Sequence, residues 1–160
     1  MSLLRTKSLQ VELAPDRVQL VQTRRRLALR GVRSSARKES LAVVAAGPDA
    51  APWRGAVQAL AAALPAHAGP AQVILANRLV RYVLVPWSDA VADAAEEMAF
   101  ARHCFERMYG EAAAHWDVRM SDEGDGVPKL ACAVDAALPG ALREVFAAAG
   151  VRLDSIQPNL

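Results

Sequence analysis

A cluster of basic residues near the start of the chain is the clearest chemical signal in the sequence. Its members are Arg24, Arg25, Arg26, Arg30, Arg33, Arg37 and Lys38. Such cations bind carboxylates and phosphates. Residues 1–40 hold ten Lys and Arg against three Asp and Glu, a net charge of +7, so residues 41–160 carry −5 of the total of +2. This asymmetry predicts a basic face for an acidic partner, an anionic lipid surface or nucleic acid. A solvated strand edge, protected from aggregation by its charge, is the alternative.

The first four arginines of the cluster form our candidate interaction patch: Arg24, Arg25, Arg26 and Arg30. No aromatic residues are interleaved with them for base stacking, so we do not expect a nucleic-acid partner. The sequence also lacks the glycine-rich patterns G-x-x-x-x-G-K-[ST] and G-x-G-x-x-G, whose N–H groups hold nucleotide phosphates. We therefore predict no cofactor.

Other reactive side chains have spacings that favour structural roles. His103 and Cys104 are adjacent on a predicted helix and point about 100° apart, unlike the i, i+4 spacing of helical zinc ligands. The acidic run at 122–126 lacks the Glu that an EF-hand has at loop position 12, where this chain has Ala133. No G-x-S-x-G elbow occurs. We predict neither a metal site nor a catalytic residue.

Further charged residues are expected to be structural or solvated. Asp89, Asp93, Glu96 and Glu97 should lie along an exposed helix face. Two arginines, Arg78 and Arg81, interrupt the apolar run 76–88. Their stems can cover apolar surface while their heads reach water or a carboxylate. We predict a structural role for both.

The cysteines and the apolar segments of the sequence indicate the cellular compartment of the protein. The two cysteines, Cys104 and Cys132, form no C-x-x-C pair, and we expect both to be reduced and buried. Near the N-terminus, Arg5 and Lys7 break any apolar leader, which predicts a cytoplasmic location. The most apolar window, 56–76, contains prolines and polar residues and is not expected to span a membrane.

The elements that position these residues alternate between strands and helices. Alternating apolar residues predict an N-terminal hairpin, 9–13 and 18–22, then a third strand at 26–33 and a fourth at 41–45. Later strands are expected at 72–76, 79–86, 116–120, 129–134 and 151–156.

Helical stripes predict three helices, at 53–64, 88–109 and 138–149. The longest should be capped by Ser88 and end at Gly110. Its expected buried stripe is Val91, Ala94, Met98, Ala101, Phe105 and Met108. The order of elements predicts an α/β or α+β layer structure, residues 1–160 forming a single lobe with a possible subdomain at about 88–135.

Scattered residues occur in an order typical of a known family. They are Ala76-Asn77-Arg78-Leu79-Val80-Arg81-Tyr82, Pro86-Trp87-Ser88, Tyr109-Gly110, Trp116-Asp117-Val118-Arg119 and Gly150-Val151-Arg152-Leu153. With them the chain resembles the N-terminal lobe of actin-like cytoplasmic proteins of type IV pilus and type II secretion assembly platforms, the pilus assembly protein M and secretion protein L group. The resemblance implies a ribonuclease-H-like lobe, a mixed sheet flanked by about three helices, docked at the inner membrane through partners.

Nucleotide-binding members of this family carry an Asp-x-Gly-Ser/Thr loop in the first hairpin and use the cleft between two lobes. Here Glu12 replaces the Asp and Ala14 replaces the Gly, and Pro15 has no N–H to donate. A second lobe would begin at about 156–160. The chain is therefore a piece of a longer protein or a one-lobed version.

We predict a non-catalytic scaffold domain of a bacterial assembly platform, at the cytoplasmic face of the inner membrane. Expected partners are other platform proteins, including a short cytoplasmic peptide of a membrane component, and a second copy of the chain. Two alternatives stay open: a nucleotide-binding actin-like ATPase lobe, and a small nucleic-acid-binding protein.

Overall fold

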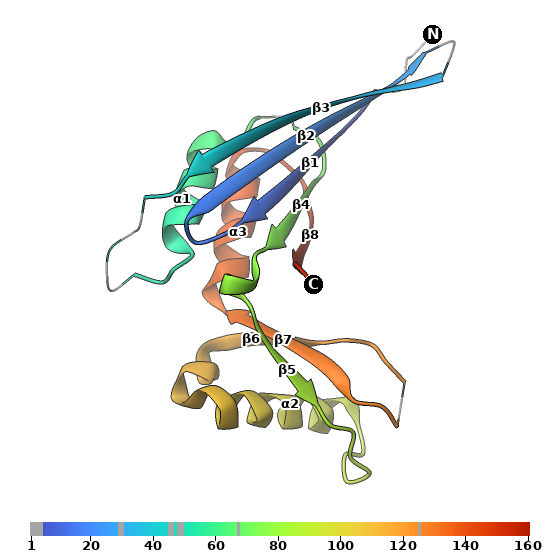
Figure 1. Cartoon of the computed structure of the whole chain (residues 1–160), viewed down its shortest axis with the longest axis vertical. Helices are drawn as coiled ribbons and strands as arrows, with labels where there is room; N and C mark the ends of the chain where they lie inside the picture. Colours follow the sequence, from blue (N-terminus) through green and yellow to red (C-terminus); the bar gives the residue numbers. More distant parts are fainter. Residues whose placement is uncertain (1–4, 29–30, 45–46, 48–49, 67, 125) are drawn as a thin grey trace. The chain divides into compact units, whose positions relative to one another are not determined.

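A computed structural model describes residues 5–28, 31–44, 47, 50–66, 68–124 and 126–160 (Figure 1). The chain divides into two compact units: unit 1 comprises Met1–Leu79 and Pro139–Leu160, and unit 2 comprises Val80–Leu138. Unit 2 thus covers a longer range than the predicted subdomain at 88–135, and its status as an insertion into a lobe stays a prediction. No helix in the described part of the chain is long and apolar enough to cross a membrane.

Unit 1 contains a five-stranded sheet in the order β3-β2-β1-β4-β8. The first three strands, β1 (Arg5–Leu13), β2 (Arg17–Ala28) and β3 (Gly31–Ala42), form an antiparallel meander. The other two strands, β4 (Ala71–Leu75) and β8 (Leu153–Pro158), continue the sheet in parallel with β1. The result is the mixed sheet that the family resemblance implied.

One face of this sheet forms the core of unit 1. Leu13 lies opposite Val18, and Val11 lies opposite Leu20, and all four side chains are at most 4% exposed. Figure 1 shows α1 (Arg54–Ala63) and α3 (Ala137–Ala148) on one side of the sheet. Their buried residues include Leu60, Leu142 and Phe146. Burial of each such side chain contributes about 1.5–3 kcal/mol, so apolar packing fixes this half of the sheet.

The predicted third and fourth strands, 26–33 and 41–45, have the wrong bounds. The structure has β2 continuing to Ala28 and β3 running unbroken from Gly31 to Ala42, each residue paired with one of β2. Residues 34–40 are all exposed. Because neither face of this segment needs apolar side chains, alternation gave no signal there. The last strand is also displaced by two residues from the predicted 151–156.

Unit 2 is a small antiparallel sheet with one helix. The sheet has the order β5-β7-β6, from β5 (Arg81–Val85), β7 (Lys129–Asp135) and β6 (Trp116–Met120). Helix α2 (Ala94–Tyr109) packs against β5 and β6, and a short 3-10 helix (Gly110–His115) follows it. The core centres on Phe105, whose ring lies 6.2 Å from each of the rings of Tyr109 and Trp116.

The predicted start of the longest helix is wrong. Helix α2 begins at Ala94 with Asp93 as its N-cap, whereas Ser88 accepts a hydrogen bond from the N–H of Ala90 in a local turn. A carboxylate three residues before a Glu is a strong capping signal. The buried stripe was also partly wrong, because Val91 precedes the helix and Met108 is 62% exposed. Gly110, at φ +69°, ends the helix as predicted.

Candidate functional site

Three strands of unit 1 extend beyond the N-terminal end of β4, at Ala71. Strand β4 pairs with β1 only from Leu9 to Leu13, whereas β1 and β2 remain paired back to Arg5 and Arg26. Figure 1 shows this part of β1, β2 and β3 projecting beyond the helices. We call residues 5–8, 22–28 and 31–38 the basic extension. Among its described side chains, those of Lys7, Ser8, Arg24, Arg25 and residues 34–38 are exposed.

The backbone of one glycine fixes where the extension begins. Gly69 has φ +93°, and a Cβ at this position would lie 2.4 Å from the backbone oxygen of Lys7. Directly after this contact, the N–H of Leu9 donates to the oxygen of Pro70 at 2.9 Å, where β4 joins the sheet. Only glycine allows both the positive φ and this close approach.

Strand register gathers cations on one face of the extension. Lys7 of β1 lies opposite Arg24 of β2. Arg37 of β3 lies opposite Gln22, two residues before Arg24 on β2. Opposite residues share a face, as do residues two apart, so Lys7, Arg24 and Arg37 stand on the same face. All three are exposed. The register then pairs Arg26 with both Arg5 and Arg33. The apolar face of the core thus becomes basic along the same strands.

A hollow of about 190 Å³ lies within this basic face. It is lined by Gln22, Arg24, Ser35, Ala36 and Arg37. One guanidinium nitrogen of Arg24 donates to Oε1 of Gln22 at 3.4 Å. Among the described residues, no carboxylate forms an ion pair with Arg24 or Arg37. The hollow therefore offers two guanidinium groups to an external anion.

The structure describes the side chains of two of the four residues of the predicted patch. Arg24 and Arg25 are exposed and, being consecutive, lie on opposite faces of β2. Arg26 belongs to β2, but its side chain lies outside the described part, and Arg30 lies outside the described residues. The structure instead brings Arg24 together with Arg37. The β2–β3 register, which pairs Arg24 with Ser35 and Gln22 with Arg37, is the signal that predicts this proximity.

The first hairpin turn has little to offer a phosphate. Ala14 N–H donates to Arg17 O at 2.9 Å, and Arg17 N–H donates to Ala14 O at 3.4 Å. Between them, Pro15 has no N–H, and the carboxylate of Asp16 would repel an anion. Asp16 lies 3.6 Å from a guanidinium nitrogen of Arg78. Two N–H groups that a phosphate loop needs are thus used to close the hairpin.

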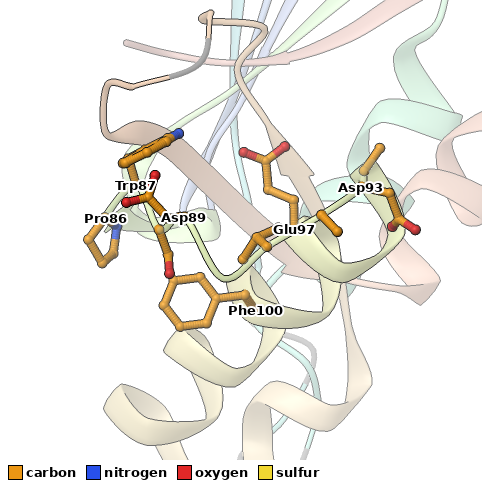
Figure 2. A pocket seen from close by; sticks show the side chains of 10 residues that line it. Pro86, Trp87, Asp89, Asp93, Glu97 and Phe100 are labelled. Atoms are coloured by element: carbon orange, nitrogen blue, oxygen red, sulfur yellow. The ribbon is translucent and has the colours of Figure 1, made fainter.

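A second hollow, of about 390 Å³, lies within unit 2 at the start of α2 (Figure 2). Figure 2 shows Trp87, Asp89 and Phe100 toward one end and Asp93 at the other, with Glu97 between them. Most of its acidic groups have partners. Asp93 accepts from the N–H groups of Ala95 and Glu96 at 2.8 and 2.9 Å. Glu97 pairs with the ammonium of Lys129 at 2.7 Å.

The prediction that these carboxylates lie on one exposed helix face is therefore wrong in part. Asp89 precedes the helix, Asp93 caps it, and Glu97 is half-buried against β7. Glu96 accepts a hydrogen bond at 2.8 Å from the N–H of Ala92, the residue before the N-cap, and so ties the first turn to the preceding segment. Helix initiation and one ion pair, rather than solvation, account for three of the four acids.

Burial rather than catalysis accounts for the shifted groups of unit 2. Burial, followed by the charge of Asp117, raises the pKa of the Cys132 thiol. Burial, followed by Cys132, raises the pKa of Tyr82. Both cysteines are free but half-buried rather than fully buried as predicted. In the described part of the chain, no three His, Cys, Asp or Glu side chains gather to hold a metal ion.

The fold of the described chain is a mixed α/β arrangement of two sheets and three α-helices. Neither a protein-family model nor a curated protein sequence matches the chain. One solved structure that it resembles is the cytoplasmic domain of EpsL, an inner membrane component of the type II secretion system of Vibrio cholerae. The TM-score is 0.60 and the identity 14%, over 96% of this chain and 57% of that one.

The PilM–PilN type IV pilus biogenesis complex contains a second similar chain. The TM-score is 0.53 and the identity 16%, over 96% of this chain and 47% of the matched one. This chain therefore spans about half the length of the structures it resembles. The resemblance inferred from the sequence is confirmed at the level of the fold.

Proposed function

We propose that the chain is a non-catalytic interaction domain of a bacterial type II secretion or type IV pilus assembly platform. Partner proteins would hold it at the cytoplasmic face of the inner membrane. The observation that carries this proposal is the likeness to two assembly proteins over 96% of the chain. One of these is the cytoplasmic domain of an inner membrane component of a type II secretion system, and the other is a chain of a type IV pilus biogenesis complex.

The closed first turn supports a non-catalytic role. Where an actin-like ATPase would hold phosphate, Ala14 and Arg17 bond to each other through their backbones. A Cβ at position 14 fills space that a glycine would leave open. We expect neither nucleotide binding nor hydrolysis.

The basic extension is the surface we propose for the partner. It combines exposed cations, a hollow and a long uncovered strand. Of the predicted patch, Arg24, Arg25 and Arg26 belong to it, and Arg30 lies outside the described residues. Candidate partners are other platform proteins, a cytoplasmic peptide of a membrane component and a second copy of the chain.

Co-purification tests this proposal. The natural protein, tagged, would be expressed in its own host and captured, with platform proteins detected by mass spectrometry. We expect at least one to co-purify, and the triple reversal of Arg24, Arg25 and Arg26 to Glu to release it. A matched variant reverses Arg102, Arg107 and Arg143 and should retain the partner. Absence of every platform protein from the wild-type capture would contradict the proposal.

Thermal denaturation separates this function from the ATPase alternative. A ligand that binds only the native state raises stability by RT ln(1 + [L]/Kd). The whole natural protein should show no increase in Tm at millimolar Mg-ATP, because the N–H groups of Ala14 and Arg17 close the hairpin and Pro15 has none. A reproducible, concentration-dependent increase would instead favour the actin-like ATPase.

A further inference from the structure

We infer that the Arg24–Arg37 hollow binds a carboxylate of an acidic, extended partner segment that pairs along β3 as an added strand. The inference rests on the proposed function, because it names the chemistry of the partner that the basic extension would bind. It is carried by three features of unit 1: an uncovered strand edge, two guanidinium groups with no internal carboxylate, and cations on both faces of the same sheet.

Strand β3 has the geometry of an open edge. It is the last strand of the sheet order, and β2 is its one partner among the described strands. Both faces are uncovered, because every residue from Ser34 to Ser40 is exposed. The backbone groups on the outer side of an edge strand can pair with another extended chain. A segment seated there would continue the sheet by one strand.

The cations beside this edge require negative charge from outside. Arg24 and Arg37 line the hollow, and the residues of the basic extension include no Asp or Glu. Glu39 is the one acid of β3, two residues beyond Arg37 on the same face. Two guanidinium groups around one hollow suit a carboxylate, which accepts paired hydrogen bonds from such forks.

The distribution of charge favours a strand over a flat membrane or a nucleic acid. Arg24 and Arg37 lie on one face of the sheet, while Arg25 and Lys38 lie on the other. A planar lipid surface can meet only one face at a time. An added strand places successive side chains on alternate faces, so adjacent acidic residues reach both pairs of cations. We therefore assign an extended segment with neighbouring Asp or Glu residues.

Fluorescence anisotropy with a defined probe tests the charge requirement. The probe is a labelled peptide of about twelve residues, in which pairs of Glu alternate with pairs of Thr, and its control has Gln for Glu. We expect the Glu peptide to bind the full chain, the Gln peptide to fail, and binding to weaken between about 50 and 300 mM NaCl.

Paired variants assign the binding to the hollow. Arg24→Gln with Arg37→Gln should weaken the Glu peptide about tenfold or more. Arg107→Gln with Arg143→Gln removes the same charge from exposed helix positions and should change affinity less than about twofold. Equal losses in the two double variants would show that only net charge matters and would overturn the assignment.

N-methylated peptides test strand addition itself. An added strand uses the N–H groups of alternate residues. Two probes, N-methylated at odd or at even positions, should therefore differ: one loses about tenfold or more in affinity and the other binds as the parent peptide. Equal binding of both would exclude pairing along β3.

Competing partners are distinguished by the same assay. Vesicles of phosphatidylglycerol or single-stranded DNA that bind the chain while the Glu peptide does not would overturn the inference. A platform protein that co-purifies equally with wild type and with the Arg24→Gln, Arg37→Gln variant would refute the inference and leave the proposed function intact. Binding of the Glu peptide, with no platform protein co-purifying, would support the inference and contradict the proposed function.

Discussion

The basic extension of unit 1 and the acidic hollow of unit 2 are both exposed and carry charge of mainly one sign, but they use it differently. In the hollow, Asp93 accepts two backbone N–H groups and Glu97 pairs with Lys129. In the extension, Arg24 makes one long hydrogen bond to Gln22, and no described carboxylate pairs with Arg37.

This difference separates charge that stabilises the fold from charge that is available for binding. A capping carboxylate satisfies donors that the helix leaves open, so its removal weakens the native state. Cations crowded on one sheet face repel each other and contribute little to folding. Substitutions in the acidic hollow of unit 2 should therefore change stability, and substitutions in the basic extension of unit 1 should change binding.

The largest effect on stability is expected at the base of the extension, where backbone rather than charge decides. Gly69→Ala places a Cβ at 2.4 Å from Lys7 O on a backbone at φ +93°. We expect a loss of about 2–3 kcal/mol in the free energy of unfolding, measured by urea denaturation. Gly47→Ala, at φ +110° with no atom within 4 Å of the added Cβ, isolates the strain and should cost about 1 kcal/mol. Equal losses would mean that the contact with Lys7 is unimportant.

Within the acidic hollow of unit 2, Glu97→Gln should give the next largest effect on stability. Its partner Lys129 has a side chain only 13% exposed, so loss of the carboxylate leaves a poorly solvated ammonium group. We expect about 1–2 kcal/mol of destabilisation, below the range for a fully buried pair because Glu97 is 25% exposed. Glu106→Gln, on an exposed face of the same helix, should change stability by less than about 0.5 kcal/mol. If Glu97→Gln left the free energy of unfolding unchanged, the charge of the acidic hollow would contribute no more to stability than the charge of the basic extension.

Asp93→Ala tests the helix cap beside that pair. Loss of the two hydrogen bonds to Ala95 and Glu96 should cost about 1 kcal/mol and reduce helix content on mild heating. The matched variant is Asp89→Ala, which removes an exposed acid of the same hollow. Circular dichroism melts should separate the two variants; coincident melts would argue that Asp93 is not the cap.

Alkaline pH should weaken unit 2 by a smaller amount. Because burial raises the pKa of Cys132 from its ordinary 9.0, the folded state holds the thiol proton more tightly than the unfolded chain. The stabilisation is present below pH 9 and is lost as pH rises through the folded value. Urea midpoints measured between pH 8 and 10 should fall with pH, and Cys132→Ala should flatten that fall. An unchanged slope would remove the thiol from the explanation.

The sequence predicts the fold best where side chains pack against a core. Residues 9–13 of β1, strand β6 (Trp116–Met120) and the helical stripe of Leu138, Leu142 and Phe146 follow apolar spacing because one side of each is buried. The bounds of β3 could not be predicted in this way, since its side chains at 34–40 are exposed on both faces. The predicted start of α2 is wrong because Ser88 is also a residue type that caps helices, whereas the Asp93–Glu96 pair marks the actual start.

The candidate site was predictable in charge but not in geometry. Consecutive arginines in the sequence suggested that Arg24, Arg25 and Arg26 act together. A strand, however, places Arg24 and Arg25 on opposite faces, and the neighbour that lines a hollow with Arg24 is Arg37, thirteen residues away. Cross-strand register creates this pair. Only a correct β2–β3 pairing could have revealed it.

The smallest effect on stability is expected from the double variant Arg24→Gln, Arg37→Gln. Both side chains are exposed, and no described carboxylate loses a partner when they change. The free energy of unfolding should stay within about 0.5 kcal/mol of wild type, and relief of repulsion favours a slight gain. Urea denaturation beside Asp93→Ala provides the comparison. A loss above about 1 kcal/mol would mean that these arginines help to hold the extension together, and that their charge is not reserved for a partner.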